Sequence, residues 1–191
     1  MYQNIKTLLY HGTVSNIEKV DVSLGFGRKD FGKGFYMAVT KKQAVGMMNK
    51  KYREAVRRSR NKKETDFTRR LYEIQLNEDV LKSLRIKKFE SADMEWLDFV
   101  LHCRKQGGMP HNYDMVIGPT ADDDTALCLK AYQDGLYGKT DSKEAKKILL
   151  GNLEPENLGV QYFIGKQEIA DKLIKSLIRI EWRESFEGKQ D

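Results

Sequence analysis

The residues near the start of the chain that could do chemistry lie in two short stretches separated by a loop. The first is YHGT, Tyr10 to Thr13, in which a histidine precedes a glycine. The second is FGKGFYMA, Phe31 to Ala38, in which two glycines flank a lysine and an aromatic pair follows. A glycine-lysine stretch of this kind can belong to a phosphate-binding loop, an ordinary turn or the wall of a nucleotide pocket.

The spacing of the glycines excludes the two common phosphate-binding loops. A Walker-type loop needs serine or threonine after the Gly-Lys pair and a helix directly behind it. Here Gly34 occupies the hydroxyl position, and strand-like residues follow. The other glycines do not give Gly-x-Gly-x-x-Gly ahead of a helix, which a dinucleotide-binding turn requires. The sequence therefore predicts that these glycines shape a turn.

Composition and charge set the class of protein. The chain has 191 residues, is 40% hydrophobic and 32% charged, and carries a net charge of +6. This length predicts a single domain spanning residues 1–191. The positive charge favours anionic partners such as nucleotides, nucleic acid or acidic protein surfaces. Two cysteines, no recognisable signal peptide and no long apolar run indicate a cytoplasmic protein without a disulfide framework or a membrane span.

Hydrophobic periodicity predicts an α+β fold, with strands near both ends of the chain and helices between them. Strands are expected at 5–13, 34–40, 69–78, 84–89, 113–119, 160–164 and 178–182. Helices are expected from residue 41 onward and at 93–105, 122–135, 142–153 and 166–177. In the last of these helices, Ile169, Leu173 and Leu177 share one face.

A basic segment covers residues 50–63, KKYREAVRRSRNKK, where eight lysines or arginines accompany one acid, Glu54. Such a segment can contact a phosphate backbone. It is also typical of a solvated helix face that runs into a loop. Both interpretations stay open at this point.

The two opening stretches together resemble signature segments of the ADP-ribosyltransferases. The resemblance is to the branch that contains diphtheria toxin and the poly(ADP-ribose) polymerases, whose signature is a spaced His, Tyr and Glu. In that branch a His-Gly pair lies on the first core strand, and a Phe-Gly-Lys-Gly turn leads into a strand that carries the tyrosine. The sequence is also similar, over nearly its whole length, to a bacterial family of uncharacterised domains assigned to that superfamily, through YHGT, DFGKGFYMA, YDMVIGPTADDD and VQYF.

The resemblance implies a split, mostly antiparallel two-sheet core with inserted helices. It also implies a mono-ADP-ribosyltransferase that uses NAD, releases nicotinamide, needs no metal and modifies an acceptor that the sequence does not name. His11 would bind the adenine-side ribose, the backbone of Gly12 the carboxamide, and the ring of Tyr36 the nicotinamide. Thr13 is included among the expected NAD-binding residues. Arg28, in the loop before the turn, would suit the pyrophosphate, although solvation explains that residue equally well.

The third signature residue is usually a glutamate, and the matching position here is Gln161 in GVQYFIG. A glutamine can hydrogen-bond the nicotinamide-side ribose but has no charge to stabilise a cationic transition state. Three outcomes stay open: slow transfer, a carboxylate supplied from elsewhere in the chain, or NAD binding without turnover. Glu168 and Glu181 are the nearest acids in sequence, and both are expected on exposed surfaces.

Two alternatives from other classes remain beside the enzyme. One is a catalytically weak NAD-binding or sensing module that lacks the glutamate. The other is a nucleic-acid-binding domain whose main contact surface is the basic segment 50–63. No metal site is expected, because His102, Cys103, His111 and Asp114 do not have a recognised zinc spacing, and Cys103 fits a helical core position.

Overall fold

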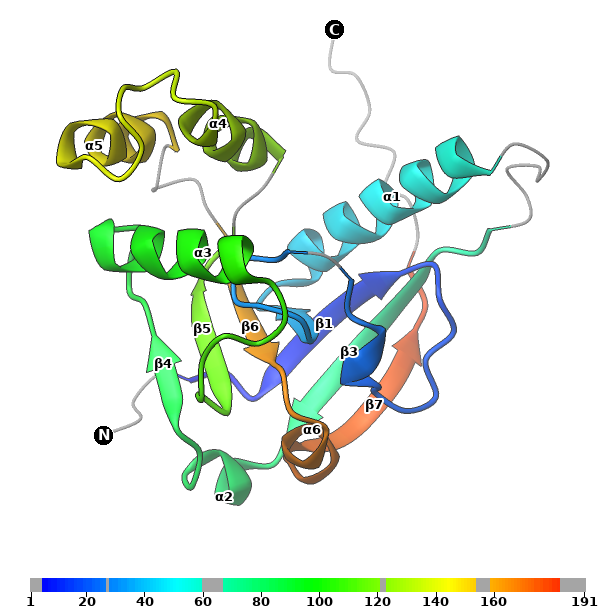
Figure 1. Ribbon diagram of the computed structural model, residues 1–191. Helices are drawn as coiled ribbons and strands as arrows, with labels where there is room; N and C mark the ends of the chain where they lie inside the picture. The colour runs from blue at the N-terminus through cyan, green and yellow to red at the C-terminus, as the bar shows by residue number, and fades with distance from the viewer. Residues whose placement is uncertain (1–4, 27, 60–66, 121–122, 154–158, 183–191) are drawn as a thin grey trace, which may run out of the picture.

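Seven strands form one sheet in the order β4-β5-β6-β2-β1-β3-β7 (Figure 1). The computed structural model describes residues 5–26, 28–59, 67–120, 123–153 and 159–182, with the side chains of 123–126 left aside. The strands are β1 (Leu8–Thr13), β2 (Phe35–Ala38), β3 (Arg70–Leu76), β4 (Ile86–Lys88), β5 (Met115–Pro119), β6 (Val160–Ile164) and β7 (Ile174–Ile180). The helices are α1 (Lys41–Arg58), α2 (Glu78–Leu81), α3 (Met94–Gln106), α4 (Asp123–Gln133), α5 (Lys143–Asn152) and α6 (Gln167–Leu173), with a short 3₁₀ turn η1 (Val22–Leu24). The predicted α+β class is confirmed.

The sheet is almost divided between β1 and β2. All neighbouring strands are antiparallel except β4 and β5. The ladder between β1 and β2 has one registered pair, Tyr10 with Ala38, whereas β1 and β3 pair continuously from Leu8↔Gln75 to Thr13↔Arg70. The expected mostly antiparallel arrangement is confirmed, but the expected two sheets are wrong, because that single pair joins the two halves.

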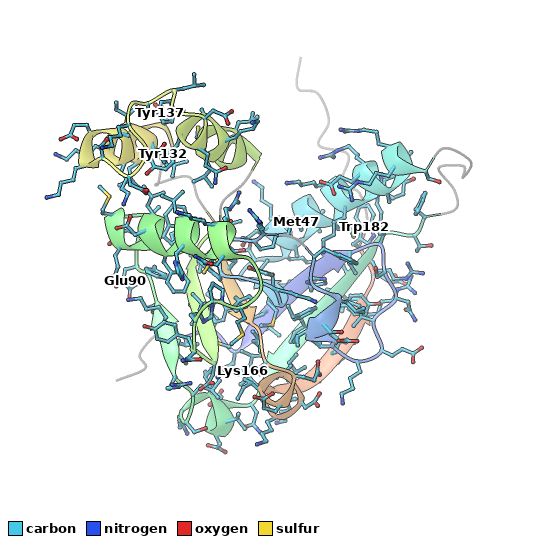
Figure 2. All side chains as sticks on the ribbon, viewed as in Figure 1. Met47, Glu90, Tyr132, Tyr137, Lys166 and Trp182 are labelled. Atoms are coloured by element: carbon cyan, nitrogen blue, oxygen red, sulfur yellow. The ribbon has the colours of Figure 1, made fainter. Side chains whose placement is uncertain are left out.

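The two faces of the sheet have separate cores. Helices α1 and α3 cover one face (Figure 1), where Trp96, Leu97 and Val100 of α3 pack with Phe163 of β6. The other face is covered by η1, α2 and α6, and its core contains Leu9, Met37, Ile74, Leu81 and Leu173. Helices α4 and α5 form a hairpin that packs on α3 through Leu129, Tyr132 and Leu149; Figure 2 shows Tyr132 and Tyr137 in this hairpin.

Local sequence explains most of these elements. Thr40 caps α1 by accepting a hydrogen bond from the Gln43 N–H, and Ala44, Met48 and Tyr52, at spacings of four, are buried on one face of the helix. In β3, Tyr72, Ile74 and Leu76 are buried while Glu73 and Gln75 are half-buried, as period-two alternation predicts. In the described residues, no helix is long and apolar enough to cross a membrane.

One predicted helix is wrong in its second half. The periodicity of residues 166–177 predicts a helix throughout, but α6 ends at Leu173 and β7 begins at Ile174. Leu177 pairs with Ile74 of β3, within a ladder that runs from Leu71↔Ile180 to Leu76↔Ile174. The spacing of four among Ile169, Leu173 and Leu177 fits one continuous helix as well as it fits the observed helix and strand. Pairing with the edge of β3 places Leu177 in a strand.

Helix α1 lies directly on Gly12 of β1. A Cβ at this position would lie 1.9 Å from the Ala44 carbonyl oxygen and 2.8 Å from the Met48 Cβ. The nearest atom belongs to helix backbone, so it cannot move aside as a side chain would. Packing therefore requires a glycine here, whatever else its backbone does.

We expect Gly12→Ala to lower the free energy of unfolding by about 2 kcal/mol or more, because α1 must move off the strand. The matched control is Gly46→Ala in the same helix, where an added Cβ meets nothing within 4 Å. That change should raise stability by about 0.5–1 kcal/mol through helix propensity. Urea unfolding of both variants measures the difference, and equal stabilities would contradict the packing described here.

Candidate functional site

His11 joins β1 to β2 through its side chain. Its Nδ1 lies 2.7 Å from the Tyr36 carbonyl oxygen, and because a carbonyl only accepts, Nδ1 carries the proton. The imidazole stacks on the Phe35 ring at 4.5 Å between centroids. Burial, and then the charge of Lys51, lower the pKa of His11 from 6.5 to about 3, against the opposing effect of the Tyr36 bond. The ring is therefore neutral near pH 7, and its Nε2 presents a lone pair.

This bond ends the β1–β2 ladder. The Leu76 N–H donates to the Thr7 carbonyl at 2.8 Å, so the backbone groups of Leu9 and His11 face β3, and those of Gly12 face β2. Had the ladder continued past Tyr10↔Ala38, the Gly12 N–H would have met the Tyr36 carbonyl. The His11 imidazole bonds that oxygen instead, so the backbone of Gly12 points into the division of the sheet.

Tyr36 is held at both ends. Its hydroxyl donates to the Gly32 carbonyl at 2.7 Å and accepts from the Phe31 N–H at 3.1 Å. Its ring packs against Phe163, with centroids 5.0 Å apart, and stays partly exposed. Burial, followed by the charge of Asp30, raises the pKa of Tyr36 well above its usual 10, so the phenol stays protonated. The ring packs against the core cluster and keeps some accessible surface.

The Phe31–Gly34 turn uses its own amides, so it is no phosphate cradle. The Gly32 N–H donates to the Lys29 carbonyl at 3.2 Å, and the Lys33 N–H to the Gly108 carbonyl at 2.5 Å. Gly32 has a φ of 102°, which favours glycine. The Phe31 carbonyl accepts from Nε2 of His111 at 2.8 Å. The prediction that these glycines shape a turn is confirmed.

Gln161 lies on β6 opposite Ala38 of β2 and is 8% exposed. Its Nε2 donates to Oδ2 of Asp30 at 3.0 Å and to the Pro119 carbonyl at 3.4 Å. Both neighbours are acceptors, which fixes the amide with its nitrogen toward them. Among the described residues, Oε1 of Gln161 has no hydrogen-bond partner.

Asp30 is the residue that the sequence did not single out. It is 6% exposed, and its Oδ1 accepts from Nε of Arg104 at 2.9 Å and from a terminal nitrogen of the same guanidinium at 2.5 Å. Its partners lie 74 and 131 residues away in sequence, so no local pattern could reveal them. Burial, followed by Asp30, raises the pKa of the nearby Cys103 thiol to about 12, which confirms Cys103 as an unreactive core residue.

The three signature positions lie on neighbouring strands, but the His11 ring stacks on Phe35 of the core on the η1, α2 and α6 face. His11, Tyr36 and Gln161 come from β1, β2 and β6, which are consecutive in the sheet. The His11–Tyr36 bond connects the first two. Tyr36 and Gln161 share the face that α1 and α3 cover, because Tyr36 pairs with Phe163 and Ala38 with Gln161 on the neighbouring strand.

The other predicted site residues have ordinary structural surroundings. Thr13 is buried, and its hydroxyl accepts from the Ser15 N–H at 3.2 Å in the turn after β1. Arg28 is exposed, and its side chain extends past Gly107 at the end of α3. Glu168 and Glu181 are exposed, as expected. Within the described residues, no three His, Cys, Asp or Glu side chains are grouped so as to hold a metal ion.

The basic segment 50–63 is described as far as residue 59, and residues 60–63 lie outside the described part of the chain. Arg53, Arg57 and Arg58 are exposed on α1, as a solvated face predicts. Lys51 differs, because burial and then the charge of Lys29 lower its pKa to about 8. Lys51 is half-buried, three residues after the buried Met48 on the same helix face, and its charge acts on His11.

A concavity of about 460 Å³ lies away from the three signature residues. It is lined by Arg69, Arg179, Ile180, Glu181 and Trp182, at the ends of β3 and β7. The Arg69 guanidinium lies 4.0 Å from the Tyr52 ring centroid, which places this surface against the C-terminal half of α1. Figure 2 shows Trp182 in this region.

Comparison with known families gives one match. The model of the family described as protein of unknown function DUF3990 matches residues 7–175, which include every signature position. The chain belongs to this family. No curated protein and no solved structure matches the chain.

For this DUF3990 protein we expect the His11 imidazole to stay neutral, with its proton on Nδ1, from pH 7.5 down to about 4.5. Its pKa in the folded state, about 3, lies below the ordinary 6.5. Protonation therefore favours the unfolded chain, and stability falls as the pH decreases from 6.5 toward 3. Ring nitrogen chemical shifts measured by NMR report the tautomer directly, and titration near pH 6.5 would contradict the buried neutral ring.

Proposed function

We propose that this protein is an NAD-dependent mono-ADP-ribosyltransferase that releases nicotinamide and transfers ADP-ribose to a macromolecular acceptor. The observation that carries the proposal is that His11, Tyr36 and Gln161 lie on three consecutive strands, with the His11 imidazole bonded to the Tyr36 carbonyl beside the division between β1 and β2. This proximity supports the proposal alongside the resemblance of the two opening stretches to the transferase signature.

The available polar groups suit the chemistry of NAD. The neutral His11 ring presents Nε2 as an acceptor, which complements a ribose hydroxyl. The Gly12 backbone offers one donor and one acceptor side by side, which is the complement of a primary carboxamide. Tyr36 offers the accessible part of its ring for stacking on nicotinamide, an interaction worth about 0.5–1.5 kcal/mol beyond burial.

Two cations favour a pyrophosphate at the same site. Lys51 and Lys29 lie close enough for Lys29 to lower the pKa of Lys51. An anion between them would relieve this repulsion and restore full protonation of Lys51. Arg28, an exposed residue whose side chain lies beside Gly107, stays a further candidate for the phosphate contact.

The reaction breaks the bond between C1′ of the ribose and the nicotinamide nitrogen. Nicotinamide leaves with the bonding electron pair, and positive charge develops on the ribose ring. The acceptor then forms a bond to C1′ and loses its proton. Gln161 offers an oxygen to the ribose 2′-hydroxyl but no formal charge, so most of the acceleration must come from positioning.

We expect the wild-type protein to bind NAD and to release nicotinamide slowly. Removing one hydrogen bond to a ribose by His11→Ala should weaken binding roughly tenfold, and Tyr36→Ala should do the same through lost stacking. Calorimetry and chromatographic detection of nicotinamide measure both steps. His102→Ala, which changes an exposed histidine of α3, is the matched control, and Tyr36→Phe preserves the ring if Tyr36→Ala does not fold.

Absence of both NAD binding and nicotinamide release in a folded wild-type protein would overturn this function. Binding without release would reduce it to an NAD-binding or sensing module. Label transfer from isotopically labelled NAD to components of a lysate would identify the class of acceptor.

A second candidate function is nucleic-acid binding along α1. The observation in its favour is that the exposed Arg53, Arg57 and Arg58 of α1 adjoin the concavity containing Arg69, Arg179 and Trp182. Closely spaced cations beside an aromatic ring suit a single-stranded polyanion. Such a strand could also be the acceptor of the proposed transferase.

If this surface binds nucleic acid, Arg57→Gln combined with Arg58→Gln should weaken binding of a short single-stranded oligonucleotide. The slope of log K against log salt should become shallower by about 0.7 for each lost phosphate contact. Fluorescence anisotropy at several salt concentrations measures this slope. Lys172→Gln, an exposed cation of α6, should leave it unchanged, and an equal effect of all three changes would indicate attraction by net charge alone.

A further inference from the structure

We propose that Asp30 is a positioning residue that holds the amide of Gln161 with Oε1 toward the ribose, so that Asp30 and Gln161 together replace the glutamate of the signature. This inference rests on the proposed transferase function. The observation behind it is the buried hydrogen bond from Nε2 of Gln161 to Oδ2 of Asp30, 3.0 Å long.

The two oxygens of Asp30 have different partners. Oδ1 accepts two bonds from Arg104, and Oδ2 accepts from Gln161. A carboxylate can accept on both oxygens at once, so Arg104 keeps Asp30 in place without competing for Gln161. The side-chain exposures of Arg104 and Asp30, 19% and 8%, show that this pair is largely removed from solvent.

The amide of Gln161 has only one favourable orientation. A flip would bring Oε1 against the Asp30 carboxylate and the Pro119 carbonyl, so that oxygen would face oxygen twice. The observed orientation leaves Oε1 as an acceptor, which a ribose hydroxyl needs. An isolated glutamine would offer its NH₂ or its oxygen with little preference, so the carboxylate behind it determines which is presented.

Asp30→Asn tests this role sharply, because an asparagine has only one acceptor oxygen. Arg104 has donors alone, so the oxygen of the introduced amide must face Arg104 and its NH₂ must face Gln161. Gln161 can accept from that NH₂ only by turning Oε1 inward, where the Pro119 carbonyl still opposes it, so the single preference for presenting Oε1 to the ribose is lost. In the double variant Asp30→Asn/Gln161→Glu, the introduced carboxylate accepts from the introduced amide with one oxygen and offers its other oxygen to the ribose.

Gln161→Glu alone does not restore the His-Tyr-Glu signature of the ADP-ribosyltransferases that the sequence resembles. It places a second carboxylate where an amide now lies 3.0 Å from Asp30, and like charges this close raise the pKa of one of the two acids. When the pKa of a carboxyl group is higher in the folded protein than in the unfolded chain, the protein becomes less stable as the pH rises above the unfolded-state pKa. We expect Gln161→Glu to be clearly less stable at pH 8 than at pH 5, and the double variant to lose most of that dependence.

The experiment compares NAD with an analogue that lacks the 2′-hydroxyl of the nicotinamide-side ribose. Dissociation constants are measured by calorimetry for the wild type, Asp30→Asn, Arg104→Lys and Asp30→Asn/Gln161→Glu, with urea unfolding of each. We expect the wild type to prefer NAD by about tenfold, Asp30→Asn to lose that preference, and the double variant to regain it. Arg104→Lys removes the bidentate contact but retains Asp30, so it should keep the preference even where it lowers stability.

The outcomes separate the two proposals. A wild-type protein that binds neither compound overturns the proposed function and, with it, this inference. A wild-type preference that persists in Asp30→Asn overturns the role of Asp30 and leaves the transferase intact. A preference lost equally in Asp30→Asn and Arg104→Lys, without recovery in the double variant, shows a purely structural ion pair and likewise overturns the inference.

Discussion

The Tyr36 carbonyl is bonded to the imidazole of His11, and the geometry of the candidate site depends on this bond. If the antiparallel ladder had continued, this carbonyl would have accepted a hydrogen bond from the β1 backbone, and the division between β1 and β2 would be absent. The histidine that makes this bond is neutral near pH 7, because burial and then the charge of Lys51 lower its pKa to about 3 although the bond itself favours the charged form. Phe35 stacks on the ring, and α1 presses on Gly12 from the other face, so β1 cannot easily move to repair the ladder.

The segment from Asp30 to Tyr36 transmits this constraint to the rest of the site. Its backbone and side chains bond to Gly108 and His111 after α3, to Arg104 within α3 and to Gln161 on β6. Each bond of this network restricts the orientation of the groups that it joins, although Nδ1 of His111 is buried without a partner among the described residues. The turn therefore fixes the Tyr36 hydroxyl, the Gln161 amide and the α3–β5 connection with one set of contacts.

Sequence patterns predicted the parts of the structure that depend on local periodicity. The alternation in β3 and the stripe of α1 follow from which positions must be buried, and both are found. The pattern failed where one spacing fits two structures, as at Leu177, whose partner Ile74 lies far away in the chain. It also gave no indication of Asp30, because a buried aspartate and an exposed loop aspartate look alike until their distant partners are placed.

The combination of Asp30 with Arg104 bears on how much charge the site can apply to a substrate. The Arg104 guanidinium is ion-paired with the buried Asp30 carboxylate and balances its charge. In the proposed transferase, Asp30 would therefore act on the ribose mainly through the direction of the Gln161 dipole, which is weaker than a formal charge at the same place. Such a site would favour binding and orienting NAD over rapid cleavage, and the proposed enzyme and the alternative sensor would differ by the strength of this one electrostatic contact.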